Sequence, residues 1–172
     1  MTAVTSSKRT AVQVRDWLRL FGMLFALLGL LVAVYMSWAE LTGQETSCPG
    51  ATAEDLQAGP GSVAVNCGYV QSSTYAKVAG IPVALLGAGG YLATLAAWAL
   101  EDRLAFLAEY GHLLVFGMAL FGFLFSAYLT YIEFFVIYTL CTWCLTSAVL
   151  MTLVFIVATA RLFQRLGGPA TA

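Results

Sequence analysis

Four cysteines, arranged as two pairs, are the side chains of this sequence best suited to chemistry. Cys141 and Cys144 form a Cys-Thr-Trp-Cys motif, whereas Cys48 and Cys67 are separated by eighteen residues. Two cysteines three positions apart on the first turn of a helix can close a small disulfide ring. The partial positive charge of the helix N-terminus favours the thiolate and makes that disulfide easier to exchange. The motif therefore predicts a redox-active pair that relays electrons with the second pair.

The segment between Cys48 and Cys67 is rich in glycine and proline, and we expect it to be mobile enough to carry a cysteine between two exchange partners. The same four cysteines could instead form two structural disulfides. They could also bind a metal ion, but such a site needs closely spaced ligands in both halves, and only Cys141 and Cys144 are close in sequence. Because the chain has one histidine, multi-histidine metal sites and Ser-His-Asp catalysis are also disfavoured.

The composition indicates what kind of protein holds these cysteines. Of 172 residues, 60% are apolar and 10% are charged, against roughly 45–50% and 25% in typical soluble domains. So few charged side chains cannot cover a water-soluble surface, and disordered chains are poor in apolar residues. A net charge of −1 and the lack of a basic stripe argue against a nucleic-acid partner. We therefore predict a membrane protein with several spans, in contact with lipid.

Long uncharged stretches predict the membrane-spanning helices. Residues 20–39 and 78–100 carry no charge, and residues 113–160 carry only Glu133. Because about 20 apolar residues cross a bilayer as a helix, the third stretch must form two spans with a turn near residues 138–143. The sequence thus predicts an all-α bundle of four transmembrane helices over residues 17–165. An extracytoplasmic capping loop with a short helix is expected at about residues 40–78, and cytoplasmic tails are expected at 1–16 and 166–172.

The distribution of basic residues predicts how the bundle is oriented. Seven of the eight lie before the first span, between the second and third, or after the fourth: Lys8, Arg9, Arg15, Arg19, Arg103, Arg161 and Arg165. Only Lys77 lies in the other set of loops. Because basic loops stay cytoplasmic, we expect both termini in the cytoplasm and all four cysteines outside it, at a plasma (inner) membrane. Disulfides persist on that outer side.

The residues around the cysteines resemble those of a known family. Asn66 and Cys67, the Ser-Ser-Thr-Tyr-Ala-Lys run at 72–77 and the Gly-Ile-Pro run at 80–82 resemble the first half of bacterial homologues of vitamin K epoxide reductase. The Tyr-Ile-Glu-Phe-Phe-Val run at 131–136, followed by the Cys-x-x-Cys motif, resembles their second half. The order of helices and cysteine pairs also fits, and the resemblance covers roughly residues 17–162.

The resemblance implies a fold and a role for each cysteine. Members of the family are four-helix bundles that hold a quinone beneath a capping loop. Carried over to this chain, Cys144 faces the quinone and Cys141 is its exchange partner. Cys67 passes electrons to Cys141, and Cys48 is attacked by the thiol of an external substrate.

The resemblance also implies the partners. The electron acceptor is a membrane quinone, menaquinone or ubiquinone, and no metal or flavin is needed because a dithiol supplies two electrons and two protons. The donor is an extracytoplasmic thioredoxin-fold (DsbA-type) protein, expected to act in trans, and the reaction supports disulfide bond formation. Reduction of vitamin K or its epoxide is an alternative, although vertebrate members carry a tyrosine where this chain has Ala148. A membrane scaffold with structural disulfides is an alternative of another class.

Four residues are candidates for binding the quinone. Ser73 matches a family serine near the cap of the quinone site, or else it caps a short helix. Tyr131 and Phe134 belong to a group of aromatic residues in the third span that could form a flat apolar slot or an interfacial belt. Because a carboxylate in lipid is costly, Glu133 should face the bundle interior. There it could transfer a proton for the hydroquinone, or accept a hydrogen bond from the backbone or a tyrosine.

Overall fold

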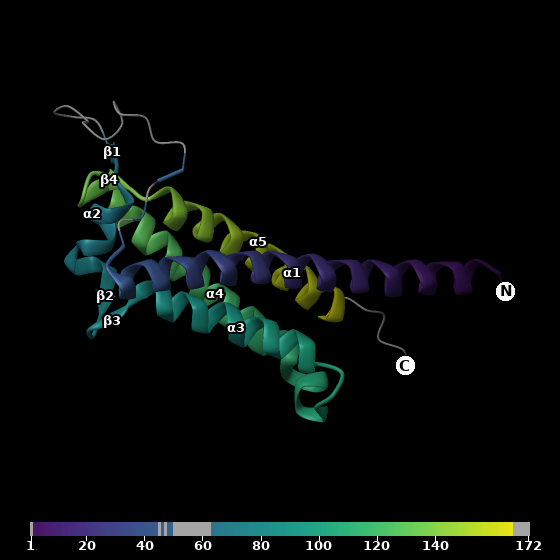
Figure 1. The fold of residues 1–172 in the computed structure, drawn as a ribbon. Helices are drawn as coiled ribbons and strands as arrows, with labels where there is room; N and C mark the ends of the chain where they lie inside the picture. Colours follow the sequence, from purple (N-terminus) through teal and green to yellow (C-terminus); the bar gives the residue numbers. More distant parts are fainter. Residues whose placement is uncertain (1, 45, 47, 50–62, 167–172) are drawn as a thin grey trace.

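Four long helices form a bundle in the computed structural model, which describes residues 2–44, 46, 48–49 and 63–166 (Figure 1). The helices are α1 (Thr2–Thr42), α3 (Val83–Leu100), α4 (Ala105–Phe135) and α5 (Thr142–Leu166). Helix α1 packs against α3 and α5, and α4 packs against the same two helices. This arrangement confirms the predicted all-α four-helix bundle.

Each long helix contains a segment long and apolar enough to cross a membrane, as predicted: Trp17–Thr42, Val83–Leu100, Glu109–Phe135 and Thr142–Leu166. Residues 136–141 divide the long apolar run at 113–160 into two helices. This break needs no glycine or proline, because Tyr138 itself adopts a left-handed φ of 53°. The amides of Val136 and Ile137 both bond to the carbonyl of Ile132, which ends the helix.

The start of α3 differs from the prediction. The apolar stretch begins at residue 78, but α3 begins at Val83. Before it, strands β2 (Lys77–Val78) and β3 (Ile81–Pro82) form a short antiparallel hairpin. Its turn residues, Ala79 and Gly80, have positive φ angles of 52° and 83°, as tight two-residue hairpin turns require. The apolar pattern hides this turn because short apolar strands and helices look alike in sequence.

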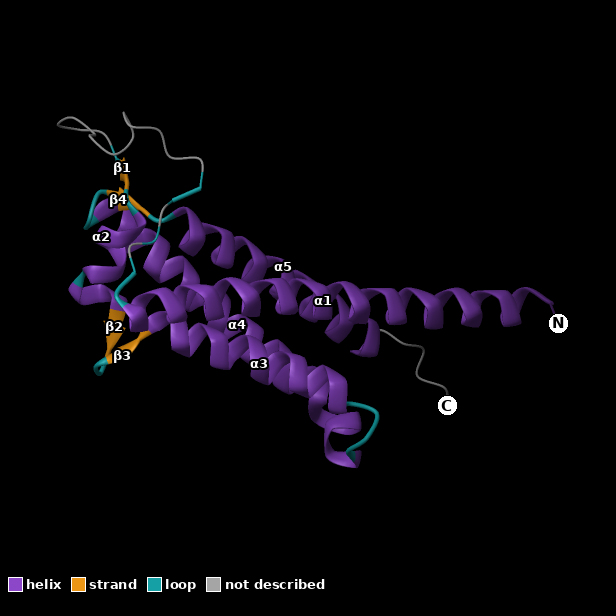
Figure 2. Ribbon diagram, viewed as in Figure 1, coloured by secondary structure: helices purple, strands orange, loops and turns teal. Residues whose placement is uncertain are grey.

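Small elements gather at one end of the bundle (Figure 2). They are strand β1 (Ala64–Val65), helix α2 (Cys67–Ser72), the 3-10 helix η2 (Thr74–Ala76) and strand β4 (Thr139–Leu140), beside the β2–β3 hairpin. Strands β1 and β4 pair in parallel and join the segment before α2 to the connection between α4 and α5. The predicted short helix of the capping loop is therefore present as α2. The turn between α3 and α4 lies at the opposite end (Figure 1).

Two glycines of α1 allow it to approach α3 closely. The ring of Tyr91 fills the space beside Gly29, and the ring of Trp98 fills the space beside Gly22, so a Cβ at either glycine would overlap a ring. Both rings are fully buried in the main apolar cluster. The Tyr91 hydroxyl also donates a hydrogen bond to the carbonyl of Ser147 on α5, 2.8 Å away. Since lipid gives no hydrophobic driving force between helices, such close packing holds the bundle together.

Ion pairs connect the helices at the end away from β1 and β4. Glu101, at the end of α3, is buried and pairs with Arg161 at 2.9 Å and with Arg165 at 3.1 Å, both on α5. Arg19 of α1 pairs with Asp102 in the turn between α3 and α4. Ion pairs therefore link the turn between α3 and α4 to both α1 and α5.

Some predicted segments are covered only in part. Helix α1 begins at Thr2, so residues 2–16, expected to be a tail, continue the first helix. Residues 45, 47 and 50–62 of the predicted outer loop, with most of the segment expected to be mobile, lie outside the described residues. The predicted tail at 167–172 also lies outside them.

Candidate active site

Cys141 lies immediately before α5 and caps its N-terminus. The amide of Leu145 bonds to the Cys141 carbonyl at 2.9 Å, and the amide of Cys144 donates to the Cys141 sulfur at 3.2 Å. The sulfur thus occupies the place of a capping side-chain oxygen. An amide donor at the positive end of a helix suits the negative charge that develops on a sulfur during exchange. The predicted position of the motif at the first turn of a helix is confirmed.

Glu133 places a carboxylate directly against the motif. Its Oε2 accepts a hydrogen bond from the amide of Cys141 at 3.1 Å, and its side chain lies beside the Cys144 side chain. Glu133 is 5% exposed and lies on the last turn of α4. The prediction that Glu133 faces the bundle interior is confirmed. Of the two roles predicted for it, proton transfer and acceptance of a hydrogen bond, the structure shows the second, with a backbone donor.

The outer pair, Cys48 and Cys67, is oxidised to a disulfide, and the motif pair, Cys141 and Cys144, is reduced. Cys48 and Cys67 form a disulfide with Cα atoms 5.5 Å apart, whereas Cys141 and Cys144 are free thiols. Cys67 is the first residue of α2, and the side chain of Asn66 caps this helix by accepting a backbone hydrogen bond at 3.0 Å. Cys67 and Cys141 therefore both lie at the N-terminus of a helix.

The parallel pairing of β1 with β4 brings the two pairs together. The amide of Asn66 donates to the carbonyl of Leu140 at 3.0 Å, and these residues directly precede Cys67 and Cys141. One residue further on, the Cys67 sulfur lies 3.7 Å from the hydroxyl oxygen of Thr142. The register of a two-residue ladder thus sets which cysteines of the two pairs are adjacent.

Exposure differs in a regular way among the four cysteines. Cys67 is 1% exposed and Cys141 is 0% exposed, and both belong to one buried cluster. Cys48 and Cys144 are partly exposed and pack against that cluster. An outside reactant can therefore reach one cysteine of each pair, while the two cysteines between them are shielded.

Apolar side chains from two other helices complete the cysteine cluster. Met36 of α1 is buried in it, and Val32 of α1 and Ala84 of α3 pack against it. Tyr35 of α1 places its ring 5.1 Å from that of Trp143, which lies inside the motif. Sequence reasoning missed these residues because they lie in uniformly apolar stretches, where nothing distinguishes a residue near the sulfurs from one facing lipid.

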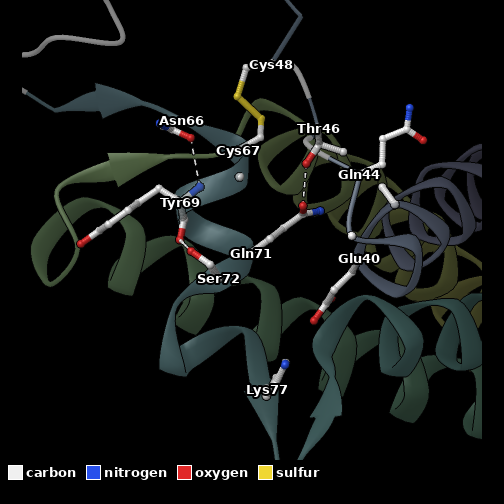
Figure 3. Close-up of a pocket in the computed structure, with 13 residues that line it drawn as sticks. Glu40, Gln44, Thr46, Cys48, Asn66, Cys67, Tyr69, Gln71, Ser72 and Lys77 are labelled. Carbon is white, nitrogen blue, oxygen red and sulfur yellow. Dashed lines mark hydrogen bonds between the residues drawn. A yellow bond between two sulfur atoms is a disulfide. The ribbon is translucent and has the colours of Figure 1, made fainter.

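A cavity of about 830 Å³ opens beside the Cys48–Cys67 disulfide (Figure 3). Its wall comes from the end of α1, from α2 and from the start of β2, segments that are separate in the sequence. The hydroxyl of Thr46 donates to Oε1 of Gln71 within this wall. Its polar lining residues include Glu40, Gln44, Thr46, Asn66, Gln71 and Lys77.

The sequence profile of the vitamin K epoxide reductase family matches residues 20–159, which is most of the chain. The chain belongs to the vitamin K epoxide reductase family. The resemblance drawn from the cysteines and their flanking residues is therefore confirmed. The family implies disulfide and quinone redox chemistry in a membrane, which fits two cysteine pairs at one end of four apolar helices.

The other three residues predicted to bind quinone in this family member have contacts of their own. The Ser73 hydroxyl donates to the carbonyl of Val70 at 2.6 Å, at the end of α2. Tyr131 stacks on Phe135 with ring centres 4.9 Å apart, and both Tyr131 and Phe134 are exposed on the surface of α4. Their contact with quinone stays a prediction.

The four cysteines are also potential ligands of a metal ion. Across the described ranges, no group of three or more His, Cys, Asp or Glu side chains is placed to hold one. Cys48 and Cys67 are joined to each other, and a metal site requires free thiolates.

Proposed function

We propose that this protein is a thiol:quinone oxidoreductase. It takes electrons from an extracytoplasmic thioredoxin-fold (DsbA-type) protein, passes them through its two cysteine pairs, and delivers them to menaquinone or ubiquinone, which supports disulfide bond formation. The observation that carries the proposal is the order of exposure, with an accessible cysteine in each pair and two buried cysteines between them. Family membership supports the same class of reaction.

Electrons move through this arrangement by thiol–disulfide exchange. A thiolate of the partner attacks Cys48, the accessible end of the outer disulfide, and releases Cys67, and the partner's second thiol then closes the partner's own disulfide. The Cys67 thiolate attacks Cys141 of the oxidised motif, Cys144 leaves as a thiolate, and Cys48 displaces Cys141 from Cys67. Two electrons and two protons thereby pass from the partner to the motif. An outer disulfide with two free motif thiols is the product of this transfer.

Oxidation of the motif dithiol by the quinone completes the cycle. The quinone supplies an acceptor for two electrons and two protons. Val32, Met36 and Ala84 form an apolar wall around the cysteines, which fits a flat uncharged ring and supports placing that ring against Cys144. Further quinone contacts are proposed for the residues predicted from the sequence: Ser73, Tyr131, Glu133 and Phe134.

The cavity beside the outer disulfide supports the approach of a protein thiol. Most of the residues that line it are of polar type, and they include the charged residues Glu40 and Lys77 (Figure 3). Such a wall suits a hydrophilic segment of a protein better than a lipid chain. When the partner is supplied in its disulfide form, the free Cys48 thiol of a Cys67→Ser variant should therefore attack that disulfide and retain the partner as a mixed disulfide. A Cys48→Ser variant is the control that should retain none.

The cysteine end of the bundle is proposed to face outward from a plasma (inner) membrane. Arg103 lies in the turn between α3 and α4, and Arg161 and Arg165 lie near the end of α5, all at the end opposite the cysteines (Figure 1). By the positive-inside rule, this arrangement supports a cytoplasmic position for both termini. A membrane-impermeant maleimide should label reduced Cys48 in intact cells, whereas labelling only after lysis would contradict this orientation.

The Cys144→Ala variant tests the proposed reaction directly. With a reduced thioredoxin-fold protein as donor, wild type should reduce menaquinone or ubiquinone, and the variant should lose this activity while its unfolding temperature is unchanged. A scaffold with structural disulfides predicts no quinone reduction in either protein. The same assay with vitamin K epoxide tests the alternative family activity, and turnover of the epoxide alone would overturn our proposal.

A further inference from the structure

Disulfide exchange needs only the sulfurs of the four cysteines, yet the carboxylate of Glu133 also lies against the Cys-x-x-Cys motif. Its buried carboxylate lies 3.1 Å from the Cys141 amide nitrogen and beside the Cys144 side chain. The ion pairs found among the described residues, which involve Glu101 and Asp102, lie at the other end of the bundle. A buried carboxylate that contacts a thiol, away from these arginines, has the placement of a proton acceptor.

We propose that Glu133 is the catalytic base of the quinone-reducing step and accepts the proton of the Cys144 thiol. This inference rests on the proposed function and names the group that moves the proton. The position of this buried carboxylate against the motif carries it, because a group that acts as a base must lie close to the proton it takes. The bond from the Cys141 amide holds the carboxylate in that position.

The step balances with groups already named. Formation of the Cys141–Cys144 bond releases two electrons and the two thiol protons. Glu133 takes the proton of Cys144, so that this sulfur gives up its electrons as a thiolate. Glu133 then passes the proton on and is again a carboxylate. Both electrons and both protons end on the quinone, which leaves as hydroquinone.

Two substitutions separate proton transfer from simple capping of the Cys141 amide. Glu133→Gln keeps the length of the side chain and an oxygen that accepts the amide hydrogen bond, but it cannot take a proton. Glu133→Leu removes both properties. Glu109→Gln, on an exposed residue near the start of the same helix, is a matched control for loss of one charge.

The experiment follows a single turnover with a short-chain menaquinone or ubiquinone analogue. Each protein is purified with the motif reduced, and hydroquinone formation is measured after rapid mixing. We expect Glu133→Gln to lower this rate by about 100-fold or more, the usual contribution of a general base, with an unchanged unfolding temperature. Its solvent deuterium isotope effect should rise, because proton transfer becomes limiting. Glu133→Leu should lower both the rate of hydroquinone formation and the unfolding temperature. Glu109→Gln should change neither quantity.

Two results would overturn the inference. A near wild-type rate in Glu133→Gln would assign the side chain to capping alone. A slow Glu133→Gln with a lowered unfolding temperature and an unchanged isotope effect would assign it a structural role. Failure of the proposed function itself is distinct, because wild type would then reduce neither quinone.

Discussion

The sulfur of Cys67 lies 3.7 Å from the hydroxyl oxygen of Thr142, which is the first residue of α5 and the neighbour of Cys141. Cys67 itself begins α2, so two helix N-termini meet at this contact. Each N-terminus carries a partial positive charge, which favours negative charge on a nearby sulfur. In the proposed relay, electrons cross from the outer pair to the motif at this point.

The Thr142→Val variant should slow exchange between the two pairs. Valine replaces the hydroxyl with a methyl group of similar size, so the sulfur loses a hydrogen-bond partner while α5 is retained. A hydrogen bond of about 0.5–1.5 kcal/mol corresponds to a slowing of about two- to tenfold. Stopped-flow measurement of internal disulfide transfer checks this. Thr146→Val is the control, since that hydroxyl bonds only to a carbonyl on an exposed face, and equal rates in both variants would refute the prediction.

Replacing Asn66 should loosen α2 at the outer disulfide. Asn66→Ala removes the side-chain oxygen that caps the helix, which costs about 1 kcal/mol, whereas Asn66→Asp retains a capping oxygen. Hydrogen exchange of the Tyr69 amide, which donates to this oxygen, reports the difference. We expect faster exchange in the alanine variant than in the aspartate variant, and identical rates would exclude a capping role.

Gly29→Ala should destabilise the bundle. The added methyl group would overlap the Tyr91 ring, which is fully buried, and overpacking of this kind typically costs about 1–3 kcal/mol. Gly89→Ala on α3 is the control, because no atom lies within 4 Å of its added Cβ. Alanine there should stabilise the helix by up to about 1 kcal/mol. Unfolding temperatures in detergent should therefore move in opposite directions, and a shift of the same sign would contradict this packing.

Glu101→Gln should destabilise the bundle more than Asp102→Asn does. It leaves Arg161, which is buried, without a carboxylate, and breaking a buried pair costs about 3–5 kcal/mol. Asp102→Asn is the control, since this carboxylate is largely exposed and surface pairs contribute about 1 kcal/mol or less. Unfolding by titrated detergent measures both. Equal stability of the two variants would show that the Glu101 pair is not a structural link.

The sequence predicted the parts of this fold that depend on length and charge. The four apolar stretches form four helices, and the run at 113–160 breaks at residues 136–141, two residues before the predicted turn at 138–143. Because a carboxylate in lipid is costly, the sequence predicts that Glu133 faces inward, and the burial of Glu133 confirms this.

Features that depend on very short segments could not be predicted. The pairing of β1 with β4 involves two residues on each side, too few to produce an alternating pattern, yet it sets the contact between Cys67 and Thr142. The apolar wall formed by Val32, Met36 and Ala84 was equally hidden, because the rotation of each helix about its axis is decided by packing partners.

The buried pairs of Glu101 have a mechanical consequence. They brace the helices at one end, while the sulfur-bearing end is joined largely through two-residue strands and a hairpin. In the proposed function, we therefore expect the long-tailed quinone to enter between the helices near the sulfurs, while the end held by the Glu101 pairs stays closed.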